Sequence, residues 1–103
     1  MIIIGMDLVG SYFSSRKGSK GMKAARAQLD AWRAIAEKAN WRSPQDLKQS
    51  HPKASILKSG RVVFNIKGND YRLVTLVRYQ NGVLMIRFFG SHEEYDQIDA
   101  ETV

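Results

Sequence analysis

The chain has 103 residues, which is enough for one domain with one hydrophobic core but too few for two domains of ordinary size. Hydrophobic residues make up 44% of it and charged residues 25%, a balance typical of folded globular proteins rather than disordered chains. Cysteine is absent, which excludes disulfide bonds, a thiolate nucleophile and cysteine-rich zinc sites. We therefore expect a single domain over residues 1–103 whose chemistry uses other side chains.

The net formal charge of +6 is distributed unevenly along the chain. Residues 53–90 carry seven basic groups and one acidic group, whereas residues 91–103 carry five acidic groups and no basic ones. A basic segment of this kind attracts polyanions, because each Lys or Arg placed on a phosphate releases counterions. A basic surface that serves only solubility is the alternative. The acidic end, from about residue 97, reads as a solvated tail.

The first residues predict a β-strand. The apolar run at residues 2–4 has no basic leader before it and is followed by Asp7, so it fits neither a signal peptide nor a membrane span. We expect a cytoplasmic protein that begins with a strand.

The next part of the chain predicts helices. Between residues 22 and 39 apolar residues recur every three or four positions, which is typical of an amphipathic helix, and a shorter helix can precede it at residues 9–15. Ser43 and Pro44 predict the start of another short helix, because Ser caps free amide groups and Pro fits the first turn. That helix must end before Pro52.

From residue 55 onward the hydrophobic pattern has a period of two and predicts an antiparallel meander. Glycines bracket a first strand at residues 61–67, and Asn81-Gly82 joins residues 71–79 to residues 83–89. The expected fold class is therefore α+β, with the N-terminal strand and the helices packed on one face of an antiparallel sheet. The other face can stay open to water.

A two-residue hairpin at Asn81-Gly82 would place Arg78 opposite Met85 and Arg87 opposite Leu76. Arginines 72, 78 and 87 would then share one face of the sheet, together with several apolar residues, which suggests a binding surface. Ordinary surface arginines paired with acidic groups are the alternative. The opposite, helix-covered face would hold Tyr71, Leu73, Val77, Leu84, Ile86 and Phe88.

Three segments stand close together between residues 41 and 99: residues 41–48 (WRSPQDLK), 61–73 (RVVFNIKGNDYRL) and 86–96 (IRFFGSHEEYD). In their order and spacing they resemble the HigB-type toxins of bacterial type II toxin–antitoxin systems, within the RelE-like mRNA interferase superfamily. The resemblance implies a RelE-like fold and ribosome-dependent cleavage of mRNA that inhibits translation. It also implies neutralisation by a cognate, HigA-like antitoxin with a helix-turn-helix module, so that DNA is contacted only through the antitoxin.

Cleavage of RNA requires a base for the 2′-OH proton, positive charge for the phosphorane and an acid for the leaving 5′-oxygen. Two histidines without a carboxylate cluster offer few metal ligands, so attack by the substrate's own 2′-OH, with no metal or other cofactor, is the economical reading. His92 is the first candidate for acid or base, since an imidazole titrates near neutrality. It can instead cap a turn or pair with Glu93. Tyr95 would share its face in a helical turn, or pack under the sheet edge.

Arginines and lysines supply the remaining candidates. Arg72 and Arg87 interrupt apolar strands, and their planar guanidinium groups suit a phosphate. The family resemblance favours Lys48 as a further catalytic residue, although a lysine that favours the helix C-terminus is the alternative. Asp70 reads as a turn residue, and Asp96 either orients His92 or Arg87 or begins the tail. RNA-binding candidates are Lys53, Lys58, Lys67 and Arg78.

Two other functions compete with mRNA cleavage. A non-catalytic RNA- or ribosome-binding module would use the same basic sheet without cutting transcripts. A DNA-binding regulator is disfavoured, because no segment shows two helices joined by a glycine turn with a basic second helix.

Overall fold

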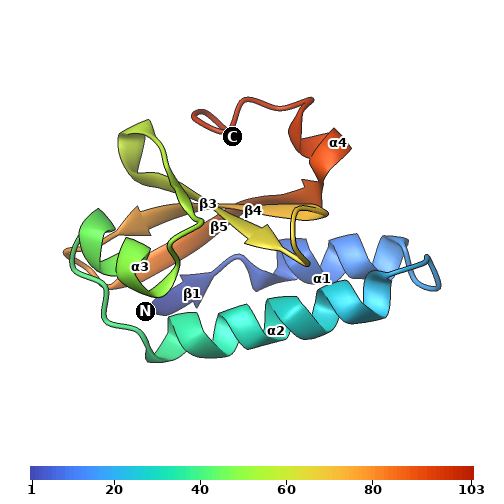
Figure 1. The fold of residues 1–103 in the computed structure, drawn as a ribbon, viewed down its shortest axis with the longest axis horizontal. Helices are drawn as coiled ribbons and strands as arrows, with labels where there is room; N and C mark the ends of the chain where they lie inside the picture. Colours follow the sequence, from blue (N-terminus) through green and yellow to red (C-terminus); the bar gives the residue numbers. More distant parts are fainter.

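A computed structural model describes residues 1–103 as a layer of helices against a five-stranded sheet. α1 and α2 run along one face of the sheet, and the C-terminal residues cross the other face (Figure 1). The α+β fold class is therefore confirmed. In chain order the elements are β1 (Ile2–Ile4), α1 (Met6–Ser15), α2 (Met22–Lys38), α3 (Pro44–Ser50), β2 (Ser55–Ile56), the 3-10 turn η1 (Lys58–Gly60), β3 (Arg61–Ile66), β4 (Tyr71–Arg78), β5 (Val83–Ser91) and α4 (His92–Tyr95).

The helices form where local patterns predict them. In α2 the buried residues are spaced by three or four and make one apolar stripe against the sheet, while its other side stays in water. α3 begins as expected, because the Ser43 hydroxyl accepts a hydrogen bond from the Asp46 amide at 3.2 Å and Pro44 occupies the first turn. It ends at Ser50, before Pro52. The optional first helix is present and starts earlier than expected, at Met6.

The strand order is β1-β5-β4-β3-β2. The antiparallel meander of β3, β4 and β5 is confirmed. However, β1 pairs with β5 in parallel, so the sheet is mixed and the expectation of a purely antiparallel sheet is wrong at this edge. Helices α1 to α3 and strands β2 to β4 lie between β1 and β5 in the chain. Because no hairpin joins β1 to β5, the two strands can pair in parallel.

The turn between β4 and β5 is longer than the predicted two-residue hairpin. Residues 79–82 form the loop, and the amide groups of Asn81 and Gly82 donate to the carbonyls of Arg78 and Tyr79 at 3.2 and 3.4 Å. Arg78 therefore lies opposite Val83 rather than Met85. The predicted register is wrong because two overlapping turns, not one, reverse the chain.

A β-bulge in β5 displaces the register a second time. Val74 of β4 pairs with Phe88, and the next residue, Thr75, pairs with Ile86. Arg87 is therefore the extra residue of β5 and has no partner on β4. Beyond the bulge Phe89 packs in the helix-side core, and Phe88 lies on the opposite face, which corrects the prediction for Phe88. The other five residues predicted for the helix-covered face are buried there as expected.

Residues after α4 cover part of the face that was expected to be open. Ala100 is buried against Val63 and Val74, with Ile98 and Val103 packed around them. The main-chain carbonyl of Val103 accepts hydrogen bonds from Arg61 at 2.9 and 3.3 Å. The expectation of a solvated tail from residue 97 is therefore wrong. Its apolar residues point to the sheet, while acidic residues between them stay exposed.

The hydrophobic core lies between the sheet and the helices and contains 19 buried residues. Aromatic rings fill both of its ends. Trp32 and Trp41 pack against Phe64 at one end, and Phe13 and Phe89 pack at the other. None of the helices has the length and apolar character needed to cross a membrane.

Candidate active site

The β5–α4 junction holds His92 in a fixed place. The Ser91 hydroxyl accepts a hydrogen bond from the Glu94 amide at 3.1 Å, while the Glu94 carboxylate accepts one from the Ser91 amide at 2.8 Å. This reciprocal capping box starts α4 at His92. The His92 amide donates to the Asp70 carbonyl at 2.9 Å, which ties the start of α4 to the β3–β4 turn. The His92 side chain is 51% exposed, so its imidazole can meet a substrate.

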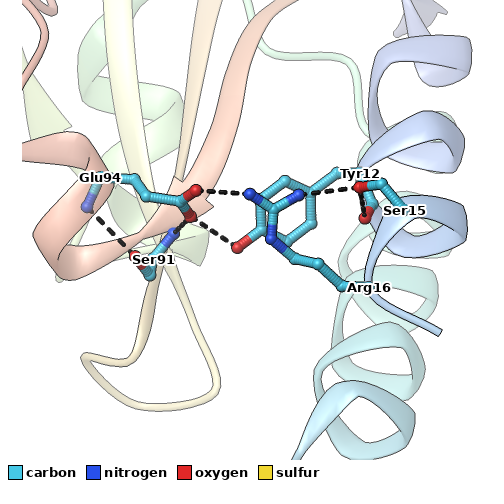
Figure 2. A network of polar contacts seen from close by, with 5 residues as sticks. All are labelled: Tyr12, Ser15, Arg16, Ser91 and Glu94. Atoms are coloured by element: carbon cyan, nitrogen blue, oxygen red, sulfur yellow. Dashed lines mark hydrogen bonds and ion pairs between the residues drawn. The ribbon is translucent and has the colours of Figure 1, made fainter. Parts of the chain in front are cut away.

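Glu94 also ties α4 to α1 (Figure 2). Its two carboxylate oxygens accept hydrogen bonds from the Tyr12 hydroxyl and from the Arg16 guanidinium, each at 2.6 Å. The guanidinium lies 3.8 Å from the centre of the Tyr12 ring and donates to the Ser15 hydroxyl. Hydrogen bonds and an ion pair therefore hold the end of α1 against the short helix that carries His92.

This network changes the acidity of two of its members. Partial burial by itself raises the pKa of Glu94, but hydrogen bonds from Ser91 and Tyr12 and the charge of Arg16 outweigh it and lower the pKa to about 2. Burial and the hydrogen bond to the Glu94 carboxylate raise the pKa of Tyr12. At neutral pH Glu94 is therefore an anion and Tyr12 is a neutral hydrogen-bond donor.

A surface hollow of about 450 Å³ lies beside His92, and we call it the His92 hollow. Two lysines from other parts of the chain line it, Lys20 from the α1–α2 loop and Lys67 from the β3–β4 turn. Lys67 has a left-handed backbone with φ of 55°, and its amide donates to the Gln28 side chain at 2.9 Å. Its ammonium lies 3.5 Å from the Asp70 carboxylate. The other lining residues are Asn69, Asp70, Tyr71, Ser91 and Glu93.

Tyr95 and Arg72 contact each other; neither lines the His92 hollow, but Arg72 bonds to two residues that do. The Arg72 guanidinium lies 5.8 Å from the centre of the Tyr95 ring, and its Nη1 donates to the carbonyls of Asn69 and Tyr71 at 2.8 and 3.3 Å. Its Nε and Nη2 have no hydrogen-bond partner in the protein, so they are available to a ligand. Asp96 lies 3.9 Å from His92 Nδ1, which is a loose pairing.

The other two catalytic candidates lie elsewhere. Arg87 is at the bulge of β5, and its Nε donates to the Val103 carbonyl at 3.3 Å. Lys48 is on α3, and its ammonium donates to the carbonyls of Pro52 and Ala54 at 2.7 and 2.8 Å. Of the five candidates, the structure thus brings Arg72 and Tyr95 into contact and places His92 on the same short helix as Tyr95.

Two of the four RNA-binding candidates line surface hollows near the β3–β4 turn, and the other two lie elsewhere. Lys67 lines the His92 hollow, and Lys53 lines a second hollow of about 470 Å³ on the other side of the β3–β4 turn. Arg78 ends β4 and lies six residues beyond Arg72, which is about 20 Å along a strand. Lys58 is in η1, which packs against β4. No three His, Asp or Glu side chains come together as a bound metal ion would require.

Several residues of this region were not predicted. The Ser91-x-x-Glu94 spacing is a capping-box signal that could have been read in the sequence. The pairing of Arg16 with Glu94 could not, because 78 residues separate them. Lys20 carried no signal beyond its charge. Nothing in the sequence distinguishes Arg61 from the other strand arginines, and only the structure shows its hydrogen bond to the Val103 carbonyl.

Comparison with known proteins identifies the family of the chain. No curated protein matches the chain. A family model described as HigB toxin, the RelE-like toxic component of a toxin–antitoxin system, matches residues 25–98, a stretch that includes α3, the meander and α4. The α1–α2 loop with Lys20 lies outside that match. The resemblance found in the sequence is confirmed, and the chain belongs to the HigB family of RelE-like toxins, the toxic components of toxin–antitoxin systems.

Proposed function

We propose that this toxin is a ribosome-dependent mRNA endonuclease. One observation carries the proposal: in a RelE-like toxin, His92, whose side chain is exposed, lines the same hollow as Lys20 and Lys67. An imidazole that can act as acid or base, placed beside cations, is a combination that phosphodiester cleavage uses. The hollow is therefore the proposed place of the scissile phosphate.

The proposed reaction uses the substrate's own 2′-OH and no metal. The 2′-oxygen attacks phosphorus while its proton passes to a base, and the bond from phosphorus to the 5′-oxygen breaks as that oxygen takes a proton from an acid. The products are a 2′,3′-cyclic phosphate and a 5′-hydroxyl. His92 serves one of the two proton transfers, and Tyr95 on the same short helix is the candidate for the other.

Arg72 is the proposed stabiliser of the phosphorane. Two carbonyls and the Tyr95 ring hold its guanidinium, while Nε and Nη2 keep free donors. A group held in place before the reaction stabilises developing charge without reorganising, which is what makes such donors effective.

Arg87 and Lys48 enter the proposal as secondary phosphate contacts. Each already donates to main-chain carbonyls, and each retains N–H groups for a phosphate. Lys53 and Lys67 would bind the RNA near the cut. Lys58 and Arg78 would bind it, or ribosomal RNA, toward the far end of the sheet.

Toxins of such systems have an antitoxin partner, and for this one we propose a HigA-like protein with a helix-turn-helix module. Co-expression of a neighbouring gene product with that pattern should restore growth. A neighbouring product that fails to do so would contradict this part of the proposal.

The ends of the RNA fragments test the reaction. Cleavage of mRNA on translating ribosomes should leave 5′-hydroxyl ends and cyclic phosphate or 3′-phosphate ends, whereas a metal-activated water leaves 5′-phosphates. His92→Ala should lower the cleavage rate by about 10² to 10⁴ and leave the melting temperature unchanged, because the side chain is exposed. Intact transcripts with the wild-type protein would favour the alternative, a non-catalytic RNA- or ribosome-binding module.

A further inference from the structure

The second hollow, which we call the Asn65 hollow, lies outside the site described above. It measures about 470 Å³ and is lined by His51, Lys53, Asn65, Asn69 and four other residues besides the buried Phe64. Asn69 lines both hollows, so the two adjoin across the β3–β4 turn. A strand of RNA that places a phosphate beside His92 would therefore bring a neighbouring nucleotide to the Asn65 hollow.

The side chains of this hollow suit a nucleobase. Asn65 Nδ2 lies 3.5 Å from Asn69 Oδ1, a long contact, and it leaves Asn65 Oδ1 and Asn69 Nδ2 without partners. Amide groups that offer both a donor and an acceptor are the groups that read base edges. Asn65 is also on the part of β3 beyond its pairing with β2, which reaches only Val62 and Val63, so this strand edge is open.

His51 forms an aromatic wall of the hollow. Its ring meets those of Trp41 and Phe64 edge to face, at 5.4 and 5.2 Å between centres. Burial lowers its pKa below the ordinary value of 6.5, so the ring is neutral at physiological pH. Bases of single-stranded RNA stack on rings of this kind. The ammonium of Lys48 holds the loop that carries the ring, through the carbonyls of Pro52 and Ala54.

From these contacts we infer that the Asn65 hollow binds one base of the mRNA next to the scissile phosphate and sets the base preference of cleavage. The inference rests on the proposed function. Asn65 and Asn69 read the edge of the base, His51 packs against its ring, and Lys53 lies at the adjoining phosphate. These residues determine where the RNA is cut rather than the chemistry of the cut.

The test is a map of cleavage positions. An mRNA library with random codons is translated on purified ribosomes with the full-length toxin, and the fragment ends are sequenced. The wild-type toxin should prefer one base at a fixed position relative to the cut. Asn65→Ala and Asn69→Ala should reduce that preference by about tenfold, the scale of one paired base contact. In Asn65→Ala, whose substituted residue does not line the His92 hollow, the rate on codons that were disfavoured should stay unchanged.

Two further variants keep the test decisive. Gln80→Ala removes the same amide group from the turn at the opposite end of β4, and it should leave the preference unchanged. Asn65→Asp keeps the shape of the side chain but exchanges a donor for an acceptor, so it should shift the preferred base even if the alanine variant is poorly folded.

Each contrary outcome has a distinct meaning. Cleavage without any base preference, or an unchanged preference in both Asn65→Ala and Asn65→Asp, would overturn the inference and leave the proposed function intact. A uniform loss of rate with a higher KM for ribosomes would assign the hollow to a ribosomal base, which also overturns it. Absence of cleavage by the wild-type toxin would instead contradict the proposed function.

Discussion

The two faces of the sheet are built differently. On the helix-covered face 19 buried residues form one continuous core, whereas on the other face the buried cluster has only three members. Leu73 and Leu76 show the contrast within one strand, because Leu73 is fully buried under the helices and Leu76 is half-buried on the other face. The C-terminal residues that cover this second face are held partly by arginine hydrogen bonds to a carbonyl.

The difference separates stability from chemistry. Apolar burial is the main source of folding free energy, so the helix-covered face carries most of the stability. Arg72, Arg87 and Tyr95 are on the thinly covered face, where a polar side chain can be exchanged without opening the core. We therefore expect substitutions on the first face to unfold the protein, and substitutions on the second to change what it does.

The largest effect on stability should come from Leu73. Leu73→Ala leaves a cavity in the main core and should lower the free energy of unfolding by about 2–5 kcal/mol. Leu76→Ala is the matched control, three residues along the same strand, and should cost about 1 kcal/mol because its surroundings are open to water. Urea unfolding measures both. Equal losses would mean that the two faces contribute alike.

Arg72 should show the opposite behaviour. Arg72→Ala should lower kcat for mRNA cleavage by about 10², as loss of a pre-placed donor does, and change stability by less than about 1 kcal/mol. Arg26→Ala on the exposed side of α2 is a control that should cleave normally. If the loss appears only in the affinity for RNA, Arg72 positions the substrate and does not stabilise the transition state.

Glu94 should make stability depend on acidic pH. Because its pKa in the folded protein is about 2, below the ordinary 4.5, its anion stabilises the fold above about pH 4.5, and this contribution is lost as the pH falls toward 2. Glu94→Gln should lower the melting temperature at pH 7. It should also make the melting temperature fall less steeply as the pH is lowered from 4.5 toward 2. Glu93→Gln, a neighbouring carboxylate with no hydrogen bond or ion pair, is the control. An equal fall in melting temperature between pH 4.5 and pH 2 in the wild type and in Glu94→Gln would contradict this.

The smallest effect should come from Arg61. Arg61→Ala removes two hydrogen bonds to the Val103 carbonyl and should cost less than about 1 kcal/mol of stability. Hydrogen exchange at the amides of Thr102 and Val103 should nevertheless become faster, because the C-terminal residues detach more often. Arg78→Ala, an exposed arginine without such a bond, should leave that exchange unchanged. Unchanged exchange in Arg61→Ala would show that apolar contacts alone hold the segment.

The sequence by itself determined the elements whose causes are local. The apolar spacing of α2, the Ser43 cap with Pro44, and the period-two strands of the meander all depend on residues within a turn or two of one another. The position of His92 at the end of the last strand also followed from the sequence, since the strand pattern stops there.

Only the tertiary structure decided the rest, because its causes are distant or cooperative. The parallel pairing of β1, the bulge that separates Phe88 from Phe89, and the longer β4–β5 turn depend on how whole strands fit together. Glu94 bonds to Arg16 and Tyr12, which precede it in the chain by 78 and 82 positions. The His92 hollow is lined by lysines from two different loops. The charge pattern of the C-terminal residues indicated a solvated tail, but burying Ala100 and bonding the Val103 carbonyl to Arg61 is what places them on the sheet.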